Sequence, residues 1–242
     1  MEVIAACHIH SEWSYDAKWT IAALSAKFAA RGCKLLLMTE HDRGFSAARF
    51  EQFRQACAAA SNGNILVVPG IEYSDAENRV HVLTWGLDSF LGENLPTGEM
   101  LAAVQGAGGV AVLAHPGRKD VWKTFDPQWV DRLLGIEIWN RKYDGWAPSP
   151  SAPALLGLGE LVPFAGLDFH TQRQSFPLTM VFDIEGDITE ANVLRCLRAR
   201  RCQARAFGRT LPDLAGSVPM MRVAEKGRRM IALMLRAARK WK

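Results

Sequence analysis

Residues 2–42 read EVIAACHIHSEWSYDAKWTIAALSAKFAARGCKLLLMTEHD, and this stretch sets the pattern for the rest of the chain. It contains two short apolar runs (residues 2–10 and 34–39) on either side of an amphipathic run (residues 20–32). Short apolar runs favour buried strands, whereas amphipathic periodicity favours a helix. Thr20 stands where a helix N-cap is expected and Gly32 where a helix ends. The stretch therefore predicts a strand, a helix and a second strand.

The same alternation continues to about residue 200 and predicts an α/β fold. Further strands are expected at residues 65–68, 80–85, 110–114, 136–139, 164–167 and 180–182. Further helices are expected at residues 45–60, 98–107, 127–134, 155–161 and 188–200. No repeat or low-complexity linker interrupts the pattern, and residues 148–153 are expected to form only a surface loop. A closed barrel and a doubly wound sheet both fit the periodicity.

The composition indicates a globular protein. Of the 242 residues, 49% are hydrophobic and 22% are charged, and no run approaches the roughly 20 apolar residues of a transmembrane helix. The amino terminus has no basic segment before a long apolar run, so no signal peptide is expected and a cytoplasmic location is the default. The five cysteines form no CxxC pair, which argues against a structural zinc knot and a disulfide framework.

The positive charge is concentrated at the carboxyl end. Residues 222–242 hold eight Lys or Arg and one Glu, a charge of +7, so the rest of the chain carries −3 of the total of +4. We therefore expect a catalytic domain over residues 1–221 and a basic C-terminal helix over residues 222–242, packed on or extending from it. Packing of its apolar stripe (Met230, Ile231, Leu233, Met234 and Leu235) against the domain is favoured over binding to a membrane or a nucleic acid.

All six histidines are expected near strand ends rather than on helix surfaces. Five lie at or just past the carboxyl end of a predicted strand: His8, His10, His41, His115 and His170. His81 lies at the start of its strand or within it. Because the carboxyl ends of the strands of an α/β barrel face the active site, these imidazoles are expected to converge.

Carboxylates accompany the histidines. Asp16 follows the first pair, Glu40 and Asp42 flank His41, Glu72 ends the run ILVVPGIE, and Asp168 stands two residues before His170. Imidazole and carboxylate together suit divalent zinc, manganese or iron. Clusters at several strand ends predict a metal site, in which Glu40, Asp42 and Glu137 are expected to support the ligands rather than bind metal.

At these residues the sequence resembles the PHP family (polymerase and histidinol phosphatase domains). The matching motifs run in the family's order over about residues 5–171: His8-Ile9-His10 with Asp16, Thr39-Glu40-His41-Asp42, Pro69-Gly70-Ile71-Glu72, His81, Ala114-His115-Pro116, and Asp168-Phe169-His170. Two positions depart from the family's pattern: Ala6 replaces an Asp two residues before the first His, and Glu40 replaces the first Asp of TDHD. Neither position corresponds to a family ligand.

The resemblance implies a distorted seven-stranded β/α barrel that holds two or three divalent ions. Carried over position by position, the first ion is expected on His8, His10, Glu72 and Asp168. A second ion is expected on Glu72, which bridges, with His81 and His115, and a third on Asp16, His41 and His170.

Such ions lower the pKa of a bridging water and neutralise charge on a phosphoryl oxygen. A metal-bridging hydroxide is then the expected nucleophile, with Asp168 or His170 moving protons and Arg118 assisting. Guanidinium groups bind phosphate in a bidentate manner, so the arginines beside the motifs are candidates for substrate binding: Arg43, Arg118, Arg141 and Arg173. The expected substrate is a small phosphorylated metabolite or nucleotide.

Other functions remain open from the sequence. The same metal-activated water attacks carbonyl esters, carbamates or amides, and a PHP-like domain can also serve as a non-catalytic metal-binding module. Nucleic-acid processing is a third alternative, which the slightly acidic charge of residues 1–221 disfavours.

Overall fold

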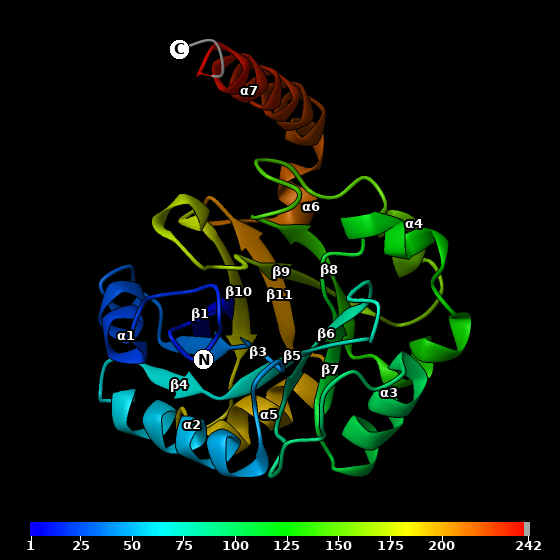
Figure 1. Cartoon of the computed structure of the whole chain (residues 1–242). Helices are drawn as coiled ribbons and strands as arrows, with labels where there is room; N and C mark the ends of the chain where they lie inside the picture. The colour runs from blue at the N-terminus through cyan, green and yellow to red at the C-terminus, as the bar shows by residue number, and fades with distance from the viewer. Residues whose placement is uncertain (240–242) are drawn as a thin grey trace.

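The computed structural model describes residues 1–239, and its strands form two six-stranded sheets (Figure 1). The first sheet has the order β12 (Arg209–Thr210), β11 (Cys202–Ala206), β10 (Leu178–Asp183), β1 (Glu2–Ile9), β2 (Leu35–Met38) and β4 (Leu66–Val68). The second has the order β3 (Glu40–His41), β5 (Gly70–Ser74), β6 (His81–Trp85), β7 (Val110–Leu113), β8 (Gly135–Asn140) and β9 (Val162–Gly166). The predicted α/β class is confirmed. Residues 1–239 form no closed barrel, so the expected distorted seven-stranded β/α barrel is not confirmed.

Two apolar runs that look like single strands are each divided between the sheets. The chain leaves β2 at Thr39 and enters β3, and it leaves β4 at Pro69 and enters β5. Proline has no N–H to donate to a sheet ladder, which explains the break at Pro69. The Thr39 N–H still donates to the carbonyl of Ile9 at 2.9 Å, and pairing with the first sheet ends there. Each of these two runs therefore contributes one strand to each sheet.

Antiparallel pairs also interrupt the β/α pattern. Five strand pairs are parallel: β1–β2, β2–β4, β3–β5, β7–β8 and β8–β9. The other five are antiparallel: β5–β6, β6–β7, β1–β10, β10–β11 and β11–β12. The strands β3, β5, β11 and β12 were not predicted as separate elements. β11 reads CQARA and is only partly buried, so its sequence lacks a continuous apolar run.

The two sheets meet where the chain leaves β9. Backbone N–H groups of Leu167 and Phe169 donate to the carbonyls of Cys7 and His8 at 3.0 Å each. The segment that carries Asp168 and His170 therefore lies against the end of β1. This contact places the first and last predicted ligand motifs side by side.

Helices cover the outer faces of the sheets (Figure 1). The α-helices are α1 (Ile21–Ala29), α2 (Ala47–Ala60), α3 (Thr97–Gly106), α4 (Ala152–Leu156), α5 (Glu190–Arg198), α6 (Leu211–Leu214) and α7 (Val218–Arg239). The 3₁₀ helices are η1 (Arg118–Lys123), η2 (Pro127–Arg132), η3 (Gln172–Gln174) and η4 (Ala215–Ser217). Thr20 caps α1 through the N–H of Ala23 at 3.1 Å, as the sequence predicts.

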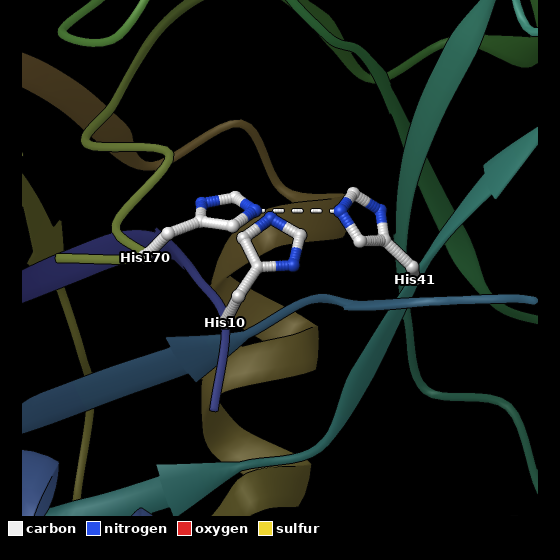
Figure 2. Close-up of side chains that lie close together, drawn as sticks. All are labelled: His10, His41 and His170. Atoms are coloured by element: carbon white, nitrogen blue, oxygen red, sulfur yellow. Dashed lines mark hydrogen bonds between the residues drawn. The ribbon is translucent and has the colours of Figure 1, made fainter. Parts of the chain in front are cut away.

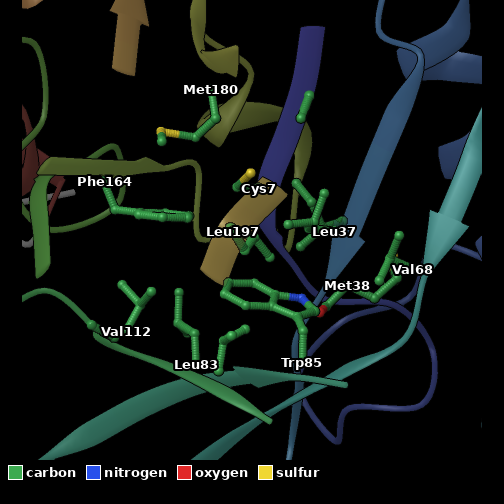
Figure 3. Packing of buried hydrophobic residues seen from close by; sticks show 14 of the residues in the cluster. Cys7, Leu37, Met38, Val68, Leu83, Trp85, Val112, Phe164, Met180 and Leu197 are labelled. Atoms are coloured by element: carbon green, nitrogen blue, oxygen red, sulfur yellow. The ribbon is translucent and has the colours of Figure 1, made fainter. Parts of the chain in front are cut away.

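The hydrophobic core lies between the sheets, where side chains from both pack around Trp85 (Figure 3). Leu37, Met38 and Val68 reach this ring from the first sheet, and Val112 and Phe164 reach it from the second. The buried indole N–H of Trp85 donates to the carbonyl of Met38 at 2.9 Å. A carbonyl at the end of β2 is thereby satisfied from the opposite sheet, so the core aligns the ends of the strands.

The carboxyl-terminal helix does not pack its apolar stripe against the domain, contrary to the interpretation that the sequence favours. α7 projects away from the sheets (Figure 1), and its apolar side chains are exposed to solvent rather than packed on the domain. Met230, Ile231, Leu233, Met234 and Leu235 are each about 60% exposed. Residues 240–242 of the predicted basic helix lie outside the described part of the chain. Over residues 1–239, no helix combines the length and apolar character needed to cross a bilayer.

Candidate metal centre

The backbone turns sharply at three of the predicted ligands. His8, His115 and Asp168 have φ values of 60°, 27° and 47°, a region that non-glycine residues rarely occupy. At His8 the cause is a β-bulge, because Cys7 pairs with Leu37 while Ile9 already pairs with the next residue, Met38. Such conformations cost about 1–3 kcal/mol and are typical of functional sites. Here each of them turns a ligand inward at the end of a strand.

Glu72 is the centre of the cluster. Its Oε1 lies 2.7 Å from His81 Nδ1, 2.9 Å from His115 Nε2 and 3.5 Å from His8 Nε2. Its Oε2 lies 3.1 Å from His41 Nδ1 and 3.4 Å from His10 Nε2. Five imidazoles thus surround one carboxylate that is 1% exposed, which is the position a bridging ligand needs.

Asp168 occupies the other side of the same pair of histidines. Its Oδ1 lies 3.8 Å from His8 Nε2 and 3.6 Å from His10 Nε2. The amine of Lys142 lies 3.2 Å from the same oxygen. His8 and His10 therefore point between two buried carboxylates, Glu72 and Asp168.

Asp16 closes the outer end of the cluster. Its two carboxylate oxygens lie 3.3 Å from His41 Nε2 and 3.2 Å from His170 Nε2. Figure 2 shows His10, His41 and His170 converging, with the Nε2 atoms of His41 and His170 3.4 Å apart. This is the end of the cluster nearest to solvent, since the Asp16 side chain is 34% exposed.

The nine predicted ligands therefore lie in one cluster. Three sets of ligand atoms fall within 4.8 Å of one another and could each hold an ion: His8, Glu72 and His115; His8, His10 and Asp168; and His10, His41 and His170. His81 joins the cluster through Glu72, and its other nitrogen lies 2.5 Å from Asn78 Oδ1. The structure brings together every residue to which the family resemblance assigns a metal.

Two buried nitrogens test whether this donor set suits a cation. The Nε2 atoms of His8 and His10 find no hydrogen-bond partner within the described chain, although both rings are 0% exposed. The Nδ1–H of His8 donates to Glu137 Oε1 at 2.8 Å, so its Nε2 carries a lone pair when the ring is neutral. Buried polar atoms normally have partners, and these two point at carboxylates. The arrangement suits a divalent ion, with Glu137 orienting His8 from behind.

The same argument holds at His10. Ser14 Oγ donates its single proton to Glu40 Oε2 at 2.5 Å, so it accepts from His10 Nδ1–H at 3.2 Å. Glu40 also accepts from the Ser11 N–H at 3.0 Å. The Glu of TEHD is therefore an orienting residue one contact behind His10, as expected from the sequence.

Protonation of the metal-free cluster follows from burial and from charge. Burial alone raises the pKa of Glu72, but the imidazoles of His81 and His8 outweigh it and hold the pKa well below the usual range. Burial lowers the pKa of His41, but its hydrogen bonds to Asp16 and Glu72 raise it to about 10. Burial likewise raises the pKa of Asp168, but the charges on His8 and Lys142 lower it to about 2. Glu72 and Asp168 are thus ionised in the metal-free protein, and His41 is protonated until a metal ion displaces its proton.

The structure adds a residue that the sequence analysis missed. Lys142 places its Nζ 3.2 Å from Asp168 Oδ1 and 3.3 Å from His170 Nε2. Burial lowers the pKa of this amine, but the charge of Asp168 outweighs that effect and raises it, so Lys142 stays cationic. Its position two residues after the end of β8 is the sequence signal that could have identified it.

The four predicted arginines divide into two pairs. Arg118 donates to the Asn78 carbonyl at 2.8 Å and to Tyr143 Oη at 3.1 Å, beside His81 and His115. Arg43 lies over the ring of Tyr15, 5.5 Å from its centroid, and Tyr15 stacks on His41. Arg141 and Arg173 instead contact each other, and Arg141 lies over Phe176. Arg43 and Arg118 are thus the arginines at the metal cluster.

A polar cavity of about 320 Å³ opens beside the cluster. Its lining includes Tyr15, His41, Arg43, Asn78 and His81. A larger, more apolar cavity of about 450 Å³ lies near Phe28, Arg31 and Thr179 and includes none of the nine ligands. Because His41 and His81 line it, the smaller cavity opens directly onto the cluster.

At the level of sequence, no family model and no curated protein matches the chain. Solved structures do match it. A two-domain protein from Bacteroides vulgatus, described as containing a "predicted PHP-like metal-dependent phosphoesterase", aligns with a TM-score of 0.63 and 16% identity over 85% of this chain and 65% of that one. This chain therefore spans slightly less than two thirds of that protein.

Two further structures extend the comparison. PsfC from Pseudomonas syringae aligns with a TM-score of 0.62 and 15% identity over 92% of this chain and 98% of its own. The lesion-specific Endonuclease Q of Pyrococcus furiosus aligns with a TM-score of 0.57 and 15% identity over 82% of this chain and 56% of its own. At these identities the likeness establishes the fold: the chain has the fold of PHP-like metal-dependent phosphoesterases.

Proposed function

We propose that the chain is a metal-dependent hydrolase of the PHP type that cleaves phosphoesters of small metabolites or nucleotides. The observation that carries the proposal is the convergence of six imidazoles and three carboxylates in one cluster. Two of these imidazoles, His8 and His10, have buried Nε2 atoms without a hydrogen-bond partner in the described chain. The fold shared with PHP-like phosphoesterases supports it. The motifs TEHD, PGIE, AHP and DFH supply five of these nine side chains, and the other four are His8, His10, Asp16 and His81.

The nine residues divide into three ligand sets, and Glu72 belongs to two of them. His8, His10, Glu72 and Asp168 would hold one ion, and Glu72 with His81 and His115 would hold a second. Asp16, His41 and His170 would hold a third. When bound, zinc, manganese or iron ions supply a water of lowered pKa and positive charge for the phosphoryl oxygens.

The ring of His170 is oriented to bind the third ion. Its Nδ1–H donates to the Asp168 carbonyl at 3.0 Å, so the neutral ring presents an Nε2 lone pair toward Asp16 and Lys142. Asp168, with its low pKa, stays ionised and holds Lys142, His8 and His10 in place.

Three cations are placed to bind the substrate. Lys142 stands next to Asp168 and His170 inside the cluster, and Arg43 and Arg118 stand at its edge. A phosphate dianion needs several donors, and together these residues provide one ammonium and two guanidinium groups. This concentration of positive charge favours a phosphoester over a neutral ester or amide.

Metal content and turnover test the proposal together. Protein purified without chelator is expected to contain two or three transition-metal ions and to release phosphate from a panel of phosphomonoesters and phosphodiesters. His10→Ala is expected to lower turnover by at least about 10³-fold, because it removes a ligand of the first ion, which His10 shares with His8, Glu72 and Asp168. A matched control is Asn64→Ala, an exposed residue in the turn before β4.

Three results would contradict the proposal. Protein without bound metal would favour a structural module. Turnover confined to carbonyl esters or amides would favour the alternative hydrolase chemistry. Metal-loaded protein that is inactive on every phosphoester and every carbonyl substrate would remove the catalytic function.

A further inference from the structure

The last helix leaves a wide apolar face in solvent. Met220 and Val223 are exposed by 78% and 70%, and further along α7 five more apolar side chains are exposed by 58–63%. Met220, Val223, Met230 and Met234 are separated by three, seven and four residues, so they form one stripe along the helix. Ile231 and Leu235 widen the stripe on one side, and Leu233 widens it on the other.

Basic residues border this stripe. Arg222 and Lys226 lie one turn apart on one edge, and both are exposed. Residues 218–239 contain six Lys or Arg and a single carboxylate, that of Glu225. A broad apolar face with cationic edges is the pattern of a helix that lies in the plane of a membrane surface.

The only carboxylate of the helix is not available to a partner. Glu225 is 5% exposed and accepts from the Trp146 N–H at 3.1 Å, from Arg228 Nε at 2.7 Å and from Arg229 Nε at 2.6 Å. Two copies of α7 that buried their apolar faces against each other would bring the cationic edges together without an opposing charge. A partner that supplies negative charge is therefore favoured over a second copy of the helix.

Two kinds of anionic partner remain, a nucleic acid and a lipid surface, and the breadth of the apolar face distinguishes between them. A nucleic acid would neutralise Arg222 and Lys226 but would leave the methionine, isoleucine and leucine side chains in water. An anionic lipid surface takes up both features, because the acyl boundary covers the apolar face and the headgroups pair with the basic edges. We propose that α7 is an in-plane anchor that binds this protein to membranes containing anionic lipids.

The anchor is firmly joined to the body of the protein. Arg229 donates to the Tyr143 carbonyl at 2.8 Å, and a Cβ built on Gly145 would overlap the Glu225 carboxylate. The first turns of α7 thus sit on the loop after β8, whose Tyr143 ring lies 4.7 Å from the ring of His115. A membrane-bound α7 holds the metal cluster in a set orientation toward the lipid surface.

Vesicle co-sedimentation of the full chain tests the anchor independently of catalysis. Binding is expected to vesicles of phosphatidylcholine with about 30% phosphatidylserine, at least about tenfold tighter than to phosphatidylcholine alone, and it should weaken as salt is raised. Ile231→Asp combined with Met234→Asp is expected to reduce binding at least about tenfold. Arg222→Gln combined with Lys226→Gln should reduce binding to the phosphatidylserine vesicles but leave the weak binding to neutral vesicles unchanged.

The control is Leu158→Asp, an apolar residue that is 47% exposed on the body of the protein. It is expected to bind vesicles like the wild type, and all variants should keep the wild-type thermal unfolding temperature because the changed side chains are exposed. Equal binding to neutral and anionic vesicles, or wild-type binding by the Ile231/Met234 variant, overturns the proposal. If the wild type forms a dimer without lipid and the Ile231/Met234 variant is a monomer, the apolar face binds a second copy of the chain. If the wild type binds duplex DNA in a salt-sensitive way but does not bind vesicles, the face binds nucleic acid. Either result also overturns the proposal.

Discussion

At the scale of single residues, the cluster depends on which nitrogen of each histidine carries the proton. Glu137 takes the Nδ1–H of His8, and Ser14, itself held by Glu40, takes that of His10. Both Nε2 atoms are thus turned toward Glu72 and Asp168 before any ion arrives. Pre-orientation of this kind reduces the free energy needed to assemble a metal site.

Lys142 supports a prediction at this scale. Lys142→Met is expected to lower kcat/KM for phosphoesters about 100-fold, because it removes the cation nearest to Asp168 and His170. Metal content should stay at the wild-type level, since the amine is not a ligand. Kinetics at saturating metal, together with inhibition by inorganic phosphate, measure the effect.

Two matched variants separate charge from structure at this position. Lys142→Arg keeps the charge and should recover part of the activity, whereas Lys123→Met removes an exposed lysine on η1 and should change nothing. A Lys142→Met enzyme with wild-type phosphate inhibition would show that the amine only neutralises Asp168.

At the scale of elements, strand ends and their irregularities set the site. The bulge at His8 and the positive φ of Asp168 each interrupt regular pairing at a candidate ligand, and the break at Pro69 leads the chain into the sheet that carries Glu72. Close approach of neighbouring strands is part of the same arrangement. A Cβ built on Gly166, at the end of β9, would overlap Glu137 Oε1 and lie 2.8 Å from the Cβ of His8.

Gly166→Ala is therefore expected to displace the Glu137 carboxylate from His8. The variant should lose about 1–3 kcal/mol of unfolding free energy through overpacking, and its metal affinity should fall about 10–100-fold through the lost orientation of His8. Chemical denaturation and competition with a chelator measure the two effects. Gly106→Ala, where a Cβ meets nothing within 4 Å, is the control and should be neutral or slightly stabilising. Equal metal affinity in the two variants would contradict the role given to Glu137.

At the scale of the whole molecule, metal binding is expected to be coupled to the release of protons. Hydrogen bonds to Asp16 and Glu72 raise the pKa of His41 to about 10, despite burial, so this ring is protonated throughout pH 6–8 in the metal-free protein. A metal ion binds only the neutral ring, and each released proton then makes the apparent affinity rise about tenfold per pH unit. Calorimetric titration with zinc or manganese in buffers of different ionisation enthalpy counts these protons. His41→Asn should release fewer protons than the wild type, and an affinity independent of pH between 6 and 8 would contradict the prediction.

The sequence alone predicted the candidate ligands and the class of fold. The α/β pattern can be read from short apolar runs, and five of the six histidines stand at the ends of such runs, which are a local property of the chain. The full set of nine candidates follows from the resemblance of the motifs to those of the PHP family. The orienting roles of Glu40 and Glu137 could be anticipated for the same reason, since both belong to these motifs.

Only the tertiary structure decided the rest. The division of two runs between sheets, the central position of Glu72, the entry of Lys142 into the cluster and the exposure of α7 depend on contacts between segments far apart in the chain. An amphipathic pattern marks an apolar face but does not say what covers it. Burial of that face against the domain or exposure to solvent is decided by the free energy of packing in the folded molecule.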